Sequence, residues 1–125
     1  MINANELRLW NWISFHPNKE INKYCQVIAI DGMEIAVMGI VVLDKEKPLL
    51  SYFDPIPLTP EMLEKAGFVW DVLFGLWIKE TETGEILLSK DYILQSTDTL
   101  TQLKYVHSLQ NLIFALTGEE LEINL

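Results

Sequence analysis

Basic residues are scarce in this chain of 125 residues, which holds nine Lys and Arg against 18 Asp and Glu, for a formal net charge of -9. The sequence contains a single arginine, Arg8. Nucleic-acid binding depends on neutralising phosphates with Lys and Arg, and docking on an anionic membrane depends on the same side chains. The composition therefore argues against both kinds of partner. The deficit is largest in residues 63–125, where ten acids and four bases give -6.

Cysteine and long apolar runs are also nearly absent. Cys25 is the one cysteine, so no disulfide can form within a monomer, which suits a reducing compartment. The longest apolar run, residues 35–43, is about half as long as a membrane-spanning helix requires. No basic region followed by an apolar run opens the sequence, so we expect no signal peptide. These features predict a cytoplasmic protein.

Motifs for catalysis and cofactor binding are missing. No glycine-rich phosphate loop occurs, and His16, His107 and Cys25 each stand alone, without the spacing of a metal site. Cys25 lies in an apolar stretch, where a thiol is inert, so a nucleophile built from Cys25 and His107 is not expected. We predict no metal and no cofactor, and we favour a non-enzymatic protein while leaving an enzyme open.

What the sequence does have is ample core material, since half of its residues are hydrophobic, and a length that fits one domain, residues 1–125. Alternation over residues 7–15 predicts a strand. Asp31-Gly32 between two apolar runs predicts a tight hairpin that pairs Ile30 with Met33. Because both faces of this hairpin are apolar, we expect a curved, mostly antiparallel sheet, either covered on both sides or closed into an SH3-like barrel.

The second half of the sequence predicts two helices, with further strands between them. Thr59 as N-cap, Pro60 at the first helical position and Gly67 as terminator define a short helix. Residues 68–80 and 85–95 read as strands joined by a turn at residues 81–84. A longer C-terminal helix is expected to begin among the N-cap candidates at residues 96–101 and to end near Gly118. A short strand over residues 120–125 is favoured after it, and a further turn opened by a capping box of Thr117 and Glu120 is the alternative. The fold class is therefore α+β.

The C-terminal helix carries an uncharged polar stripe beside its apolar face. His107, Gln110, Asn111 and Phe114 follow the spacing i, i+3, i+4 and i+7, which places them on one side of a helix. Such residues are most often partly buried, where a charge would be costly. The alternative hypothesis is a contact surface for a partner or a small ligand. Four tryptophans are secondary candidates if exposed: Trp10, Trp12, Trp70 and Trp77.

Three stretches of the chain resemble a family of small uncharacterised proteins of bacterial genomes and of phages and prophages. They are NELRLWNWISF at residues 5–15, PIPLTPEMLEKAGF at 55–68 and KYVHSLQNLIFALTGEELEI at 104–123. The chain departs from the family pattern at Trp10, where glycine is usual, and at Ser108, where glutamine is common. No activity is established for the family, so the resemblance implies an accessory role in mobile elements and no mechanism.

These observations favour a protein-interaction module that binds an unidentified protein partner or a second copy of itself. One alternative is a small-molecule binder or enzyme with a pocket near the C-terminal helix and His107. Another is an acidic mimic of nucleic acid, which would array carboxylates on one face at the spacing of phosphates.

Overall fold

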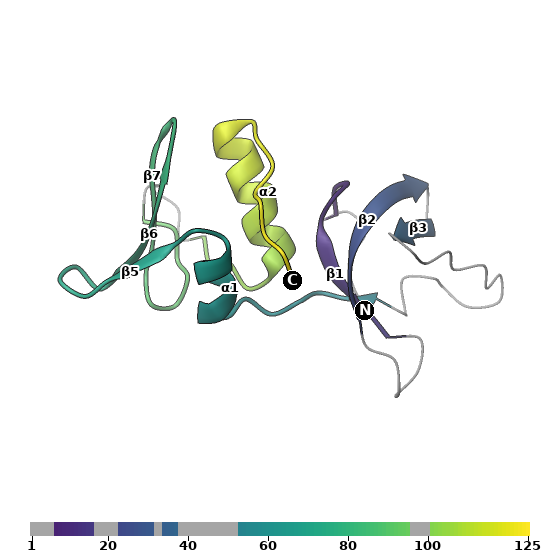
Figure 1. The fold of residues 1–125 in the computed structure, drawn as a ribbon, viewed down its shortest axis with the longest axis horizontal. Helices are drawn as coiled ribbons and strands as arrows, with labels where there is room; N and C mark the ends of the chain where they lie inside the picture. Colours follow the sequence, from purple (N-terminus) through teal and green to yellow (C-terminus); the bar gives the residue numbers. More distant parts are fainter. Residues whose placement is uncertain (1–6, 17–22, 32–33, 38–52, 96–100) are drawn as a thin grey trace. The chain divides into compact units, whose positions relative to one another are not determined.

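The structure, a computed structural model, describes residues 7–16, 23–31, 34–37, 53–95 and 101–125. Contacts group the chain into two compact units, residues 1–56 with Leu125 and residues 57–124. Within the described residues each unit has its own antiparallel sheet, and the second unit also holds the helices (Figure 1). The predicted α+β class is confirmed.

The sheet of the first unit contains β1 (Trp12–Phe15), β2 (Lys23–Asp31), β3 (Glu34–Val37) and β4 (Phe53–Asp54). Among the described strands the order is β3-β2-β1-β4, and each neighbouring pair is antiparallel. The register of β2 against β3 shifts between Val27 and Ala29, and such a bulge bends a strand. The sheet is thus curved, as expected. The described strands do not close into an SH3-like barrel, because β3 and β4 remain its two edges.

The hairpin of β2 and β3 has a different register from the predicted one. Asp31 pairs with Glu34 and Ile30 with Ile35, so the prediction that Ile30 pairs with Met33 is wrong. The connecting residues are Gly32 and Met33, which lie outside the described residues. Glycine at the first position of a two-residue connection is the sequence pattern of a type II′ turn, which competes with the Asp-Gly pattern of a type I′ turn.

The first strand begins later than predicted because a turn over Arg8–Asn11 precedes it. The Asn11 N–H donates to the Arg8 carbonyl at 3.2 Å, and the buried Asn11 side chain accepts from the Arg8 N–H at 2.6 Å. Trp10, third in this turn, has φ +72°. A positive φ at the third position is typical of a type II turn and favours glycine. The side-chain hydrogen bond of Asn11 therefore replaces the extended backbone that alternation predicts.

The short helix of the second unit, α1 (Pro60–Lys65), forms as its capping residues predict. The Thr59 hydroxyl accepts the Met62 N–H at 3.3 Å, and Pro60 takes the first turn. At the other end Gly67 has φ +93°, and the Phe68 N–H donates to the Leu63 carbonyl at 2.9 Å. This Schellman-type arrangement satisfies the terminal carbonyls of the helix.

The second sheet has the order β5-β6-β7 in the described part of the chain: β5 (Val69–Asp71), β6 (Leu76–Thr81) and β7 (Gly84–Leu88). Thr81 pairs with Gly84 across the predicted turn at residues 81–84. One face of the sheet is buried, with Trp77, Ile86 and Leu88 on it. The prediction of one strand over residues 68–80 is wrong, because residues 72–75 form a turn that divides it into β5 and β6.

The C-terminal helix, α2 (Val106–Thr117), begins after the predicted N-cap region, of which residues 96–100 lie outside the described residues. The backbone before the helix is hydrogen-bonded to other segments of the chain. The Leu94 N–H donates to the Thr101 carbonyl, and the Leu58 N–H donates to the Lys104 carbonyl. Gly118 ends the helix with φ +73°, as predicted.

The segment after Gly118 is not the strand that its alternation predicts. Residues 120–125 have no strand pairing among the described residues. Leu121 and Ile123 are nevertheless buried while Glu122 is exposed. Alternate residues of this segment are therefore buried as predicted, although the segment pairs with no described strand.

The strain at Trp10 predicts an inverted order of stability for two substitutions. Both Trp10→Gly and Trp10→Ala remove the indole, but a left-handed backbone costs alanine about 1–2 kcal/mol and costs glycine almost nothing. We expect Trp10→Gly to be more stable than Trp10→Ala by about 1 kcal/mol in urea unfolding. The usual order, with the alanine variant the more stable, would show that the turn does not hold this φ.

Candidate functional site

The predicted polar stripe on α2 is buried over much of its length. His107 and Gln110 are each 1% exposed, Asn111 is half-buried, and Phe114 is 40% exposed. The His107 ring stacks on the Tyr105 ring, with centroids 5.6 Å apart and an interplanar angle of 8°. Side chains this deeply buried offer little surface to a partner. The absence of charge on this stripe therefore follows from burial, since an ionised group there would lose its hydration.

The four tryptophans differ in exposure. Trp77 is buried, Trp12 is half-buried, and Trp10 and Trp70 are exposed. Trp70 and Trp77 lie directly opposite each other on β5 and β6, with ring centroids 5.4 Å apart and tilted by 59°. A tilted aromatic pair of this kind contributes about 0.5–1.5 kcal/mol beyond its buried area. This cross-strand contact therefore stabilises the pairing of β5 with β6.

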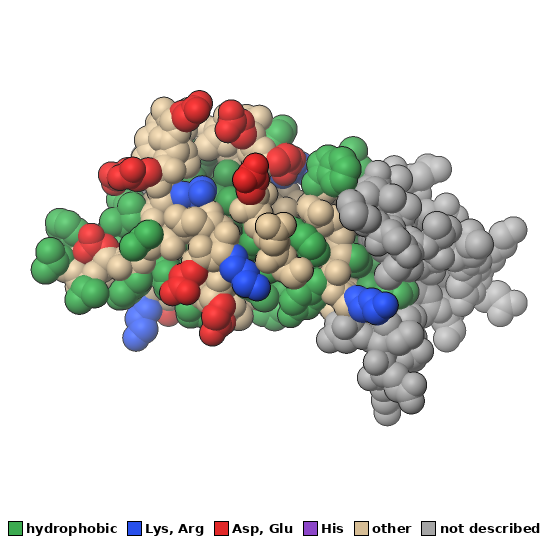
Figure 2. Space-filling view, in the orientation of Figure 1, with side chains coloured by type: hydrophobic (Ala, Val, Ile, Leu, Met, Phe, Trp, Pro, Cys, Tyr) green, Lys and Arg blue, Asp and Glu red, His purple; other side chains and the backbone are tan. Residues whose placement is uncertain are grey.

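The end of this hairpin is an apolar tip formed by Val72, Leu73 and Phe74. Their side chains are 84%, 91% and 75% exposed. Figure 1 shows the connection between β5 and β6 projecting from the end of its sheet, and Figure 2 shows apolar side chains gathered there. Turns normally carry glycine, proline, asparagine, aspartate or serine. Three consecutive large apolar residues at a turn are therefore not explained by the needs of the turn itself.

Asp71 holds the backbone of the tip. Its carboxylate accepts the Leu73 N–H at 2.9 Å and the Phe74 N–H at 3.1 Å. Its carbonyl accepts the Gly75 N–H at 2.8 Å, and Gly75 has φ +64°. These bonds satisfy backbone donors that no strand partner reaches, as an aspartate at the start of a turn commonly does. The tip is thus an ordered turn that presents its apolar side chains to solvent.

Sequence reasoning missed this tip because apolar residues run through it without interruption. A continuous apolar pattern over residues 68–80 favours one buried strand. The signal for the turn was Asp71 followed four residues later by Gly75, a pair of turn-forming residues inside an apolar run.

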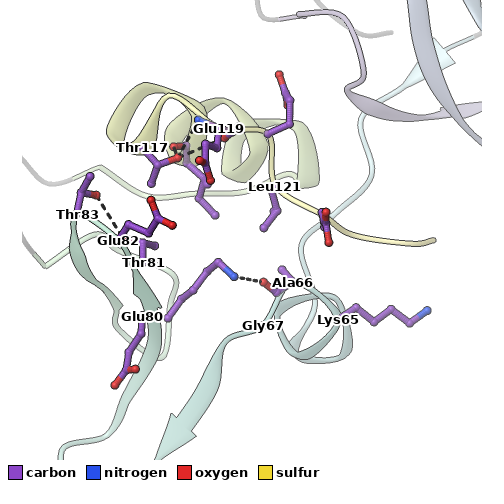
Figure 3. Close-up of a pocket in the computed structure, with 14 residues that line it drawn as sticks. Lys65, Ala66, Gly67, Glu80, Thr81, Glu82, Thr83, Thr117, Glu119 and Leu121 are labelled. Carbon is purple, nitrogen blue, oxygen red and sulfur yellow. Dashed lines mark hydrogen bonds between the residues drawn. The ribbon is translucent and has the colours of Figure 1, made fainter.

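A cleft of about 720 Å³ lies beside α2 in the second unit, between the end of α1, the β6–β7 turn and the C-terminal segment (Figure 3). The Lys79 ammonium donates to the Ala66 carbonyl at 2.7 Å, and a Cβ on Gly67 would come within 2.7 Å of the Lys79 Nζ. The carboxylates around the cleft, including Glu82 and Glu119, belong to exposed residues. This lining gives structural support to the end of α1 and identifies no catalytic pair.

The remaining candidates for chemistry are separate from one another. Cys25 is buried, and its thiol donates to the Ile13 carbonyl at 3.6 Å. Burial raises the pKa of Cys25 to about 11. His16 contacts Asp54. The described residues contain no group of three or more His, Cys, Asp or Glu side chains arranged to hold a metal ion.

Comparison with known proteins gives no relative from which a function could be transferred. No family model, no curated protein and no solved structure matches the chain. In the described part of the chain, no helix combines the length and the apolar character needed to cross a membrane. The candidate site therefore rests on the geometry of the apolar tip.

Removing the Asp71 carboxylate should release the tip. We expect Asp71→Ala to lose two backbone hydrogen bonds, to reduce the free energy of unfolding by about 1 kcal/mol and to speed amide exchange at Leu73 and Phe74. Asp71→Asn keeps an acceptor oxygen and is the matched control. Identical NMR order parameters at these two amides in the alanine variant and the wild type would show that the carboxylate does not order the tip.

The Cys25 thiol should react slowly in the folded protein. A pKa of about 11 instead of 9.0 lowers the thiolate fraction at pH 8 by about a hundredfold. We expect modification by a disulfide reagent to be slower than in the urea-unfolded chain by at least that factor. The unfolded state loses its thiol proton first, so this group also makes the unfolding free energy fall between pH 9 and 11. Equal rates in both states would contradict the burial.

Proposed function

We propose that this chain is a non-enzymatic interaction module that inserts the apolar tip, Val72, Leu73 and Phe74, into an apolar pocket of a protein partner. The observation that carries the proposal is the exposure of three consecutive apolar side chains on an ordered turn. Exposed apolar residues in one patch are typical of interaction sites. An ordered tip also loses less conformational entropy on binding than a mobile loop would.

The magnitudes support a specific but modest contact. Burying a large apolar side chain completely stabilises a complex by about 1.5–3 kcal/mol. Because the three side chains of the tip are 75% to 91% exposed, the part still available for burial could supply about 4–7.5 kcal/mol. Association costs about 4–15 kcal/mol of translational and rotational freedom. The tip therefore works as an anchor that needs contacts around it.

A protein fits this tip better than a lipid surface does. Asp71 lies directly before the tip, Glu80 lies further along β6, and residues 63–125 have a net charge of -6. Anionic membranes repel such a surface. The same charge disfavours a second copy of the chain as the occupant, because two acidic surfaces would meet.

The test is photo-cross-linking from the tip. A photoreactive phenylalanine derivative replaces Leu73, and an otherwise identical protein carries it at Thr83, on the exposed turn between β6 and β7. We expect position 73, and not position 83, to label one identified protein in the source cells. The added change Phe74→Ser should reduce that labelling at least tenfold, because it removes an adjacent anchor.

Leu116→Ser is the matched control, since Leu116 is an exposed apolar residue of the same unit away from the tip. It should leave labelling unchanged. Labelling that survives Phe74→Ser would contradict the proposal. So would co-sedimentation of the wild type, but not of the Phe74→Ser variant, with phosphatidylcholine vesicles, because the tip would then bind lipid.

A further inference from the structure

A groove runs beside the apolar tip on the outer face of β5 and β6. Its volume is about 390 Å³, and it is lined by Gly67, Val69, Trp70, Asp71, Ile78 and Glu80. If the proposed function holds, the partner that receives the tip also lies over this groove. The free energy that burial of the tip can supply does not clearly exceed the cost of association, so a second contact is needed for a stable complex.

The floor of the groove is apolar and its two ends are acidic. Val69 and Ile78 are directly opposite each other in the register of β5 and β6, and Val69 is 68% exposed. Asp71 lies two residues from Val69 towards the tip, and Glu80 lies two residues from Ile78 in the other direction. Because alternate residues share a face, the two carboxylates flank this floor at a separation of about 13 Å along the strands.

Glu80 lines the far end of the groove, and a second carboxylate, Glu85, lies beside it in the sheet without lining the groove. Glu80 on β6 is directly opposite Glu85 on β7, and both are exposed. Glu80 also lines the cleft beside α2 (Figure 3). Like charges directly opposite in a sheet are destabilising. Lys79, the nearest base in sequence, donates to the Ala66 carbonyl and is not among the residues that line the groove.

We propose that this groove binds an arginine side chain of the same partner. The methylene stem of arginine would lie on Val69 and Ile78, as long cationic side chains commonly cover apolar surface. Its guanidinium would lie at Glu80 and Glu85. The planar fork of donors can reach two carboxylates at once, which the single ammonium of lysine does less well. The partner surface is thus an apolar pocket with an arginine at its border.

The experiment is an NMR titration of the full chain with N-acetyl-arginine amide. N-acetyl-citrulline amide, which has nearly the same shape and no charge, is the control ligand. We expect arginine to shift the amide signals of Val69, Ile78, Glu80 and Glu85 in a saturable way, and citrulline to shift them at least fivefold less. Raising the salt concentration should weaken the arginine effect, because exposed charges are screened.

Two variants with the same change of net charge locate the site. Glu80→Gln should weaken arginine binding by about 1.4- to 5-fold, the equivalent of 0.2–1 kcal/mol for an exposed ion pair. Glu64→Gln should leave binding unchanged, because exposed Glu64 on α1 is not among the residues that line the groove. Equal effects of the two variants, equal binding of citrulline, or shifts confined to residues other than the groove lining and Glu85 would each overturn the inference.

The outcome is separable from that of the proposed function. Cross-linking from position 73 that depends on Phe74, together with no arginine binding, would refute the arginine site alone. Arginine binding in the groove without any protein labelled from the tip would refute the docking of the tip.

Discussion

The pair of hydrogen bonds from the Leu73 and Phe74 amides to the Asp71 carboxylate is the constraint on which the candidate site depends. A turn between two short strands has backbone donors that no ladder satisfies, and an aspartate at its start accepts them. With the backbone satisfied in this way, the side chains of the turn need not serve the fold. They are large and apolar all the same, and they face solvent. This combination separates the tip from an ordinary hairpin turn.

The polar stripe of the C-terminal helix illustrates the opposite case. The sequence favoured partial burial of His107 and Gln110 and left a contact surface as the alternative, and both residues are buried. Their lack of charge is a consequence of that burial, since desolvating an ion costs more than desolvating an amide or a neutral imidazole. Polar type by itself was therefore a poor guide to exposure. The exposure of the apolar side chains at the tip could be read only from the structure.

The sequence predicted correctly those elements whose ends are set by interactions between residues close together in the chain. The short helix α1 is bounded by Thr59 and Gly67, whose effects act within four residues, and the prediction is confirmed. The start of α2 could not be predicted in the same way. The segment before it bonds to Leu58 and Leu94, which are distant in sequence, and these bonds compete with helix formation. The hairpin tip was missed because hydrophobic periodicity reports apolar character and cannot distinguish a buried apolar side chain from an exposed one.

We propose that the tip serves binding, and its exposure implies that it contributes little to folding. Urea unfolding of a variant in which Val72, Leu73 and Phe74 are together replaced by serine measures that contribution. Because these side chains are 75% to 91% exposed, we expect the unfolding free energy to change by no more than about 0.5 kcal/mol for each residue replaced. A loss of several kcal/mol would show that the tip is part of the core of the protein, and would contradict both its exposure and its assignment as the contact surface.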